Sequence, residues 1–173
     1  VGFHIDRSAV CGALCRRLVD NGSLISGQKR RINMKVRRES SEPSYLMDYS
    51  EWYCFSAGRE EFGSLTDFGY ACAYWQYRDN IAILTESLKR NGFSLEHTQP
   101  WEKRREEFAP QPISAHTFCE KLVYHFRDYL PKLPAMPEES VQGAMIMLEE
   151  WNSVLLVAQL AESYVGCWWI TDV

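Results

Sequence analysis

The chain has 173 residues, of which 46% are hydrophobic and 24% are charged, proportions typical of a globular protein rather than a disordered one. Its formal net charge of -4 speaks against a general nucleic-acid-binding protein, because such proteins usually carry a basic domain. It contains no run of about 20 apolar residues, so we expect no transmembrane helix. The length predicts a single domain covering residues 1–173.

The first part of the chain predicts one helix followed by two strands. Residues 8–20 show the four-residue spacing of a helix in Val10, Leu14 and Leu18, and an Asn-Gly pair follows. At residues 32–36 apolar and polar side chains alternate, which predicts a strand with one buried face. The aromatic run at residues 51–56 predicts a second strand.

The middle of the chain predicts three helices. We expect one long helix over residues 66–90, ending at an Asn-Gly pair, and a short charged helix over residues 100–108. Ser114 is placed to cap a further helix that runs to about residue 130. The next segment, residues 131–137, contains three prolines and is expected to form a stiff linker.

The last quarter of the chain predicts a helix and a hairpin. A proline suits the first turn of a helix over residues 137–151, which we expect to place Met145 and Leu148 inward. Residues 154–160 and 164–170 are β-rich apolar runs that predict a C-terminal β-hairpin, either buried on both faces or with one face kept for a partner. Together the elements predict an α+β fold, with four to five helices packed on a small, mainly antiparallel sheet.

Six cysteines raise the question of disulfide bonds. Cys54, Cys72 and Cys167 each lie between apolar or small residues, where a free thiol behaves as a small buried hydrophobe. A chain of this length does not depend on disulfides for a core. We therefore expect reduced thiols and a cytoplasmic protein.

Charge is divided unevenly along the chain. Six of the ten residues at 29–38 are basic and none is acidic, whereas no Lys, Arg or His follows Lys132. A division of this kind bears on partners rather than on fold. In the acidic last quarter, charge would steer a basic protein and aromatic residues would anchor it. The expected partner-binding residues are Glu138, Glu139, Glu149, Glu150, Trp151 and Glu162.

Two other groups of residues give alternative functions. His116 and Cys119 lie one helical turn apart, and a Cys/His pair can form the nucleophilic centre of an enzyme. Packing is the simpler explanation for Cys119, because it lies on the apolar stripe of its helix. The basic segment 29–38 would suit a nucleic-acid-associated subunit, although charges on an edge strand also discourage edge-to-edge pairing.

No motif for a cofactor or a metal ion stands out. The chain lacks a GxSxG motif, a phosphate-binding loop, a dinucleotide-binding glycine pattern and an HExxH motif, each of which would be a specific sign of chemistry. We therefore predict no cofactor and no metal site, and an enzyme is the less favoured interpretation.

The last quarter resembles the C-terminal ends of small bacterial immunity proteins. The likeness lies in LEEWN at residues 148–152, in the apolar run 154–158 and in YVGCWW at residues 164–169. Immunity proteins are cytoplasmic proteins that bind and neutralise a cognate toxin, often a nuclease. The resemblance implies a protein-binding module that occludes a basic toxin or nuclease and has no catalytic residues of its own.

Overall fold

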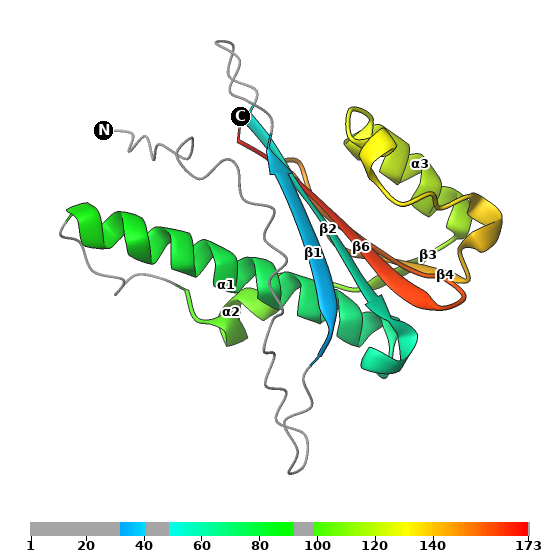
Figure 1. Ribbon diagram of the computed structural model, residues 1–173, viewed down its shortest axis with the longest axis horizontal. Coiled ribbons are helices and arrows are strands. Elements are labelled where there is room, and N and C mark those ends of the chain that lie inside the picture. The colour runs from blue at the N-terminus through cyan, green and yellow to red at the C-terminus, as the bar shows by residue number, and fades with distance from the viewer. Residues whose placement is uncertain (1–31, 41–48, 92–98, 173) are drawn as a thin grey trace.

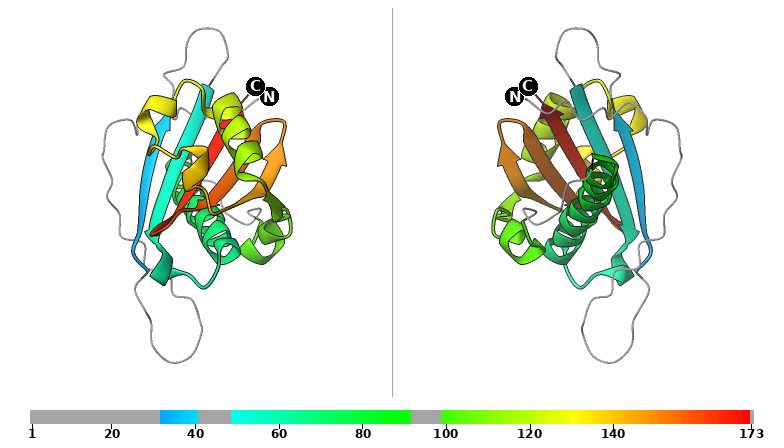
Figure 2. Two further views of the ribbon diagram at one scale, coloured as in Figure 1. Left: turned by 90° about the vertical axis from the view of Figure 1, so that its right-hand side faces the viewer. Right: turned by 90° about the vertical axis from the view of Figure 1, so that its left-hand side faces the viewer.

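The computed structural model describes residues 32–40, 49–91 and 99–172. The expected helix at 8–20 and the first three residues of the basic segment, 29–31, lie outside this part of the chain. The described residues form three layers, in which a six-stranded sheet lies between two helices (Figure 1). One helix crosses each face of the sheet, as the two side views show (Figure 2).

The strand order is β1-β2-β6-β5-β4-β3, and every neighbouring pair is antiparallel. The strands are β1 (Met34–Ser40), β2 (Tyr49–Gly58), β3 (Gln111–Ile113), β4 (Gly143–Glu150), β5 (Ser153–Gln159) and β6 (Ser163–Asp172). The helices are α1 (Leu65–Asn91), α2 (Trp101–Arg105) and α3 (Ala115–Phe126). Short 3-10 turns lie at Arg59–Glu61, Leu130–Lys132 and Glu138–Ser140.

Alternation along the strands separates two hydrophobic cores, one on each face of the sheet. The core under α1 includes Tyr53, Phe55, Phe68, Cys72, Met147, Leu155 and Trp168. The core under α3 includes Trp52, Cys54, Phe118, Leu122, Val154, Leu156 and Cys167. Strand β5 lies well inside the sheet and its residues 153–158 are all buried, so for this strand the structure selects burial on both faces from the two alternatives that the sequence left open.

The expected fold of four to five helices on a small sheet is wrong. The described residues contain three helices, and only α1 and α3 are longer than one or two turns, whereas the sheet has six strands. The helix expected at 137–151 is instead a 3-10 turn followed by β4. Ala144 and Met145 pack into opposite cores, as neighbours on a strand do. Pairing of β4 with β3 and β5 thus overrides the helix-forming composition of this segment.

Several expected elements are confirmed. The long helix expected at 66–90 is α1, and the C-terminal hairpin is formed by β5 and β6. The Ser114 side chain accepts a hydrogen bond from the backbone N–H of Thr117 at 3.0 Å, so Ser114 caps α3 as expected. This helix ends at Phe126, earlier than expected, and the chain continues into the 3-10 turn Leu130–Lys132.

The proline-containing segment 131–137 packs against the sheet layer rather than standing apart from it. Leu133 and Met136 are buried in the core under α3. No helix in the described residues combines the length and the apolar character that crossing a membrane requires.

Candidate functional site

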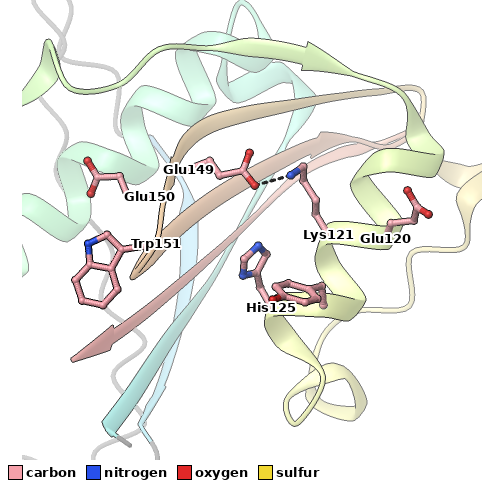
Figure 3. Close-up of a pocket in the computed structure, with 7 residues that line it drawn as sticks. Glu120, Lys121, His125, Glu149, Glu150 and Trp151 are labelled. Atoms are coloured by element: carbon pink, nitrogen blue, oxygen red, sulfur yellow. Dashed lines mark hydrogen bonds and ion pairs between the residues drawn. The ribbon is translucent and has the colours of Figure 1, made fainter. Parts of the chain in front are cut away.

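An open hollow lies between the outer side of α3 and the connection from β4 to β5 (Figure 3). We call it the α3–β4 hollow, and its volume is about 620 Å³. It is lined by Glu120, Lys121, Tyr124 and His125 of α3 and by Glu149, Glu150 and Trp151 at the end of β4. Carboxylates and aromatic rings therefore meet at one place on the surface.

Burial of one side of α3 decides which side chains reach the hollow. Phe118, Leu122 and Phe126 recur every four residues and are buried on the sheet. This packing fixes the rotation of the helix about its axis. Glu120 follows Phe118 by two residues and Tyr124 follows Leu122 by two, so both point to solvent on the opposite side of the helix.

A β-bulge in β4 brings Glu149 to the α3 side of the sheet. Ile146 pairs with Leu156 and Leu148 pairs with Leu155, so Met147 is an extra residue in β4. Met147 and Leu148 both lie in the core under α1. Without the extra residue, strict alternation from Ile146 would point Glu149 to the opposite face.

The hollow exposes two large aromatic side chains. Tyr124 is 81% exposed and Trp151 is 74% exposed, while Val123, the chain neighbour of Tyr124, is 52% exposed. These three are the exposed large hydrophobic residues of the described part of the chain. By contrast, Trp52 and Trp168 are fully buried in the two cores. Exposed aromatic side chains gathered in one place are typical of an interaction surface.

Ion pairs leave the hollow with an excess of negative charge. Lys121 Nζ donates a hydrogen bond to Glu149 Oε1 at 2.5 Å. At the start of α3, His116 contacts Glu138 at 3.1 Å and Glu120 at 3.5 Å. In the described residues no cation pairs with Glu150. The lining therefore contains three carboxylates and one ammonium group, that of Lys121, which is already paired with Glu149.

His125 lines the hollow and lies among aromatic rings. Its imidazole is 4.9 Å from the ring of Tyr124 and 5.3 Å from the ring of Trp169, measured between ring centres. Burial lowers the pKa of His125 below the usual 6.5; nearby Glu149 raises this pKa and Lys121 lowers it. His125 is therefore neutral at pH 7 and adds no positive charge.

The structure brings together only some of the expected partner-binding residues. Glu149, Glu150 and Trp151 line the α3–β4 hollow. Glu138 and Glu139 lie in a 3-10 turn beside the start of α3, with Glu138 on His116. Glu162 lies in the turn between β5 and β6, at the other end of these strands from Trp151, so it is not part of the hollow.

Sequence reasoning missed the contribution of α3 to this surface. Tyr124, His125 and Lys121 were not expected as partner-binding residues, although they line the hollow. The sequence does hint at this contribution. Val123 and Tyr124 are apolar residues that lie outside the apolar stripe of the helix, which contains Phe118 and Leu122, so they are not needed for packing on the core.

The geometry gives little support to a Cys/His centre. His116 is paired with carboxylates on both sides, and the Cys119 thiol points to the backbone oxygen of Met136 at 4.0 Å. Burial, followed by Glu138 and Glu139, raises the pKa of Cys119, which disfavours a reactive thiolate. Among the residues that the structure describes, no three His, Cys, Asp or Glu side chains are grouped so as to hold a metal ion.

In the described part of the basic segment, two arginine side chains contact other residues of the same protein. Arg37 donates to Glu39 at 2.5 Å and lies over the ring of Trp52. Arg38 pairs with the buried Glu51 and, at 3.3 Å, with Asp79. These charges are engaged within the fold, which weakens the case for phosphate binding by β1.

Comparisons of the chain with protein-family models, with curated proteins and with solved structures found no match.

Proposed function

We propose that the protein is a cytoplasmic protein-binding module that captures a basic protein at the α3–β4 hollow. The observation that carries this proposal is the exposure of Tyr124 and Trp151 beside three carboxylates, Glu120, Glu149 and Glu150. A large exposed aromatic side chain has no evident role in stability, whereas aromatic residues are enriched among the side chains that dominate binding energy.

Negative charge around the two aromatic residues favours a cationic partner. The carboxylates lie at the rim, where charge mainly accelerates encounter and excludes partners of like charge. The aromatic side chains then supply the area that becomes buried in the complex. Glu138 and Glu139 extend the acidic surface along α3 toward its first turn.

The partner class that we propose is a basic toxin or nuclease, which the module would neutralise by occluding it. Binding alone achieves this effect, so no catalytic residue is needed on this chain. The resemblance of residues 148–169 to the ends of immunity proteins supports the same proposal. The cytoplasmic location in this proposal follows from the expectation that a chain of this length has a core of its own and does not depend on disulfide bonds.

Photo-crosslinking in the cells that produce the protein tests the proposal. A photoreactive phenylalanine analogue replaces Trp151 in one variant and Glu102, exposed on α2, in a control variant. We expect a basic protein to be crosslinked from position 151 and not from position 102. The purified partner should lose its toxic or nuclease activity when one equivalent of this protein is added.

Charge reversal supplies the matched control. Glu149→Lys with Glu150→Lys should abolish capture, because it replaces attraction by repulsion at the hollow. Glu102→Lys with Glu106→Lys makes the same change in net charge on an exposed surface elsewhere and should leave capture intact. Undiminished capture by the folded Glu149/Glu150 variant would refute the proposal.

A further inference from the structure

We infer that Cys54 and Cys167 form an oxidative modification site, a pair of facing thiols that hydrogen peroxide converts into a disulfide between β2 and β6. The two residues are directly opposite each other in the antiparallel pairing of these strands, which lie side by side in the sheet (Figure 1). Both side chains belong to the core under α3, and neither lines the α3–β4 hollow. The site therefore goes beyond the proposed function and does not depend on it.

The hydrogen-bond pattern of the sheet brings these two side chains close together. The backbone N–H of Arg59 donates to the carbonyl oxygen of Glu162 at 3.2 Å, one step beyond the last pair of the β2–β6 ladder. Hydrogen-bonded and non-hydrogen-bonded pairs alternate along an antiparallel ladder. Cys54 precedes Arg59 by five residues, so Cys54 and Cys167 form a non-hydrogen-bonded pair, the kind in which opposite side chains are closer.

The other neighbour of β6 gives the same assignment. The backbone N–H of Leu160 donates to the carbonyl oxygen of Ser163 at 2.8 Å, and four residues further along β6 the alternation makes Cys167 a hydrogen-bonded partner of Leu156. The backbone groups of Cys167 thus face β5 and not β2. Cα atoms of a non-hydrogen-bonded pair are about 4.5 Å apart, which lies within the range of about 4.4–6.8 Å found in disulfides.

The two thiols are suited to different steps of an oxidation. The Cys167 thiol donates a hydrogen bond to the Cys54 sulfur, which lowers the pKa of Cys54 against the effect of burial, and the Arg37 guanidinium lowers it further. The same hydrogen bond, together with burial, raises the pKa of Cys167. Cys54 is also 8% exposed, whereas Cys167 is fully buried. Cys54 is therefore the thiol that attacks a small oxidant, and Cys167 is the thiol that resolves the product.

The oxidation proceeds in two steps. The Cys54 thiolate attacks one oxygen of hydrogen peroxide and the O–O bond breaks, so that Cys54 becomes a sulfenic acid and the departing hydroxide takes up a proton to become water. The Cys167 sulfur then attacks the Cys54 sulfur, the S–O bond breaks, and the hydroxyl group leaves with the Cys167 proton as a second water. Two thiols lose two electrons and two protons, and the peroxide is reduced. In a reducing compartment such a disulfide is transient, because thiols reduce it again.

Cys72 provides the internal comparison. It is fully buried, as Cys167 is, but it lies in the core under α1 on the other face of the sheet. Burial raises the pKa of its thiol well above the usual value, which disfavours attack on peroxide. Cys72 should therefore stay reduced while Cys54 and Cys167 are oxidised.

Peptide mapping of the whole chain tests the site. Reduced, folded protein is treated with hydrogen peroxide, the remaining thiols are alkylated in urea, and the chain is digested with trypsin. Cleavage after Lys and Arg places Cys54 in the peptide 39–59, Cys72 in 60–78 and Cys167 in 133–173, each as the single cysteine of its peptide. We expect 39–59 joined to 133–173, about 2 Da lighter than the two reduced peptides together and separated by dithiothreitol, and 60–78 alkylated.

Two variants assign the roles of the thiols. In Cys167→Ala the resolving thiol is missing, so oxidation of Cys54 should stop at the sulfenic acid, which dimedone traps on peptide 39–59. Cys72→Ala makes the same truncation in the other core and should leave the yield of joined peptides unchanged. The map of the unaltered chain does not depend on whether either variant folds.

Two results from the unaltered protein would overturn the inference. One is the absence of joined peptides 39–59 and 133–173 after peroxide treatment of the folded chain. The other is a mixture in which 39–59 is joined to 133–173 no more often than to other cysteine-containing peptides, because the pairing would then not be selected by the fold. Neither result bears on capture of a basic protein at the α3–β4 hollow, which the variants of Glu149 and Glu150 test separately.

Discussion

Lys121 on α3 and Glu149 on β4 are 28 residues apart in the chain, and a hydrogen bond of 2.5 Å between their charged groups joins the helix to the end of the sheet. Both residues line the α3–β4 hollow, and Figure 3 shows the pair linking α3 to the end of β4. It therefore fixes the spacing between the two walls, one carrying Tyr124 and the other carrying Trp151. Both side chains of the pair keep partial contact with solvent, so we expect the pair to orient the walls more than to stabilise the fold.

A double-mutant cycle on Lys121→Met and Glu149→Gln measures this pair. We expect a coupling free energy of about 0.2–1 kcal/mol in urea unfolding, decreasing as salt is added, because the pair is only partly shielded from water. A coupling above about 3 kcal/mol would instead mean that the pair is a buried structural element. The pair Glu102→Gln and Lys121→Met, whose members are not in contact, is the additive control.

The pKa values of the two histidines in helix α3 are expected to lie on opposite sides of 6.5, the usual pKa of histidine. The hydrogen bond to Glu138, helped by nearby Glu120, raises the pKa of His116 above 6.5. Burial lowers the pKa of His125 below 6.5, against the opposing effect of Glu149. NMR titration of the imidazole ring protons should place the His116 midpoint above that of His125, and the reverse order would contradict the described contacts.

The same shifts predict opposite effects of pH on stability. For His125 the unfolded state takes up the proton first, so its contribution to stability is present above about pH 6.5 and is lost as the pH falls below that value. For His116 the folded state holds the proton more tightly, so its contribution is present below about pH 6.5 and is lost as the pH rises through the folded pKa. His125→Gln should therefore reduce the loss of unfolding free energy on acidification, and His116→Gln should not.

Local pattern was enough to predict most of the elements. The long helix α1, the capped start of α3 and the hairpin of β5 and β6 each have their own periodicity or capping residue, such as Ser114. Strand β4 could not be predicted in this way, because Met145 and Leu148 have a spacing that also suits a helix. Its partners are strands β3 and β5, and the pairing that decides its structure is not visible in the segment itself.

The candidate site was predictable only in part, for a related reason. Composition indicated Glu149, Glu150 and Trp151, which are adjacent in sequence and remain together in the structure. Tyr124 could be joined to them only by the packing of α3 on the sheet. Glu162 was expected in the same surface, but the antiparallel course of β5 carries it to the opposite end of the hairpin.

Gly69 lies where α1 packs against Met147, the extra residue of the β4 bulge. A Cβ atom added at Gly69 would lie 2.4 Å from the sulfur of Met147, which is fully buried. Glycine inside a helix costs about 1 kcal/mol relative to alanine, yet here it makes room for the extra residue of the bulge. Gly69→Ala should therefore lower the free energy of unfolding by about 1–3 kcal/mol instead of raising it.

This packing is tested by whether the effect of Gly69→Ala on the free energy of unfolding changes sign when Met147 is truncated. In a Met147→Ala background the clash is gone, so Gly69→Ala should stabilise the protein by about 1 kcal/mol through helix propensity alone. Urea unfolding of the four proteins of the cycle measures the effect. If Gly69→Ala destabilises both backgrounds equally, the contact between Gly69 and Met147 does not control how closely α1 approaches the sheet.

Substitutions of Trp151 and Trp168 should affect different properties: the first should weaken binding, and the second should lower stability. Trp168 is buried in the core under α1, and its indole nitrogen donates a hydrogen bond to Ser153 at 2.7 Å. Trp168→Ala should therefore cost about 3–5 kcal/mol of unfolding free energy, as truncation of a large buried aromatic residue does. Trp151→Ala removes a side chain that is mostly in water and should change the unfolding free energy by less than about 0.5 kcal/mol.

When binding of the partner is measured instead of stability, Trp151→Ala should have the larger effect of the two substitutions. Once the partner is identified, Trp151→Ala should weaken its affinity by about 2 kcal/mol or more, because an aromatic anchor at the centre of an interface carries a large share of the binding energy. Urea unfolding and calorimetric titration on the same samples give the two values. A folded Trp151→Ala protein with unchanged affinity would mean that the exposed indole is incidental, since neither the core nor the partner would then depend on it.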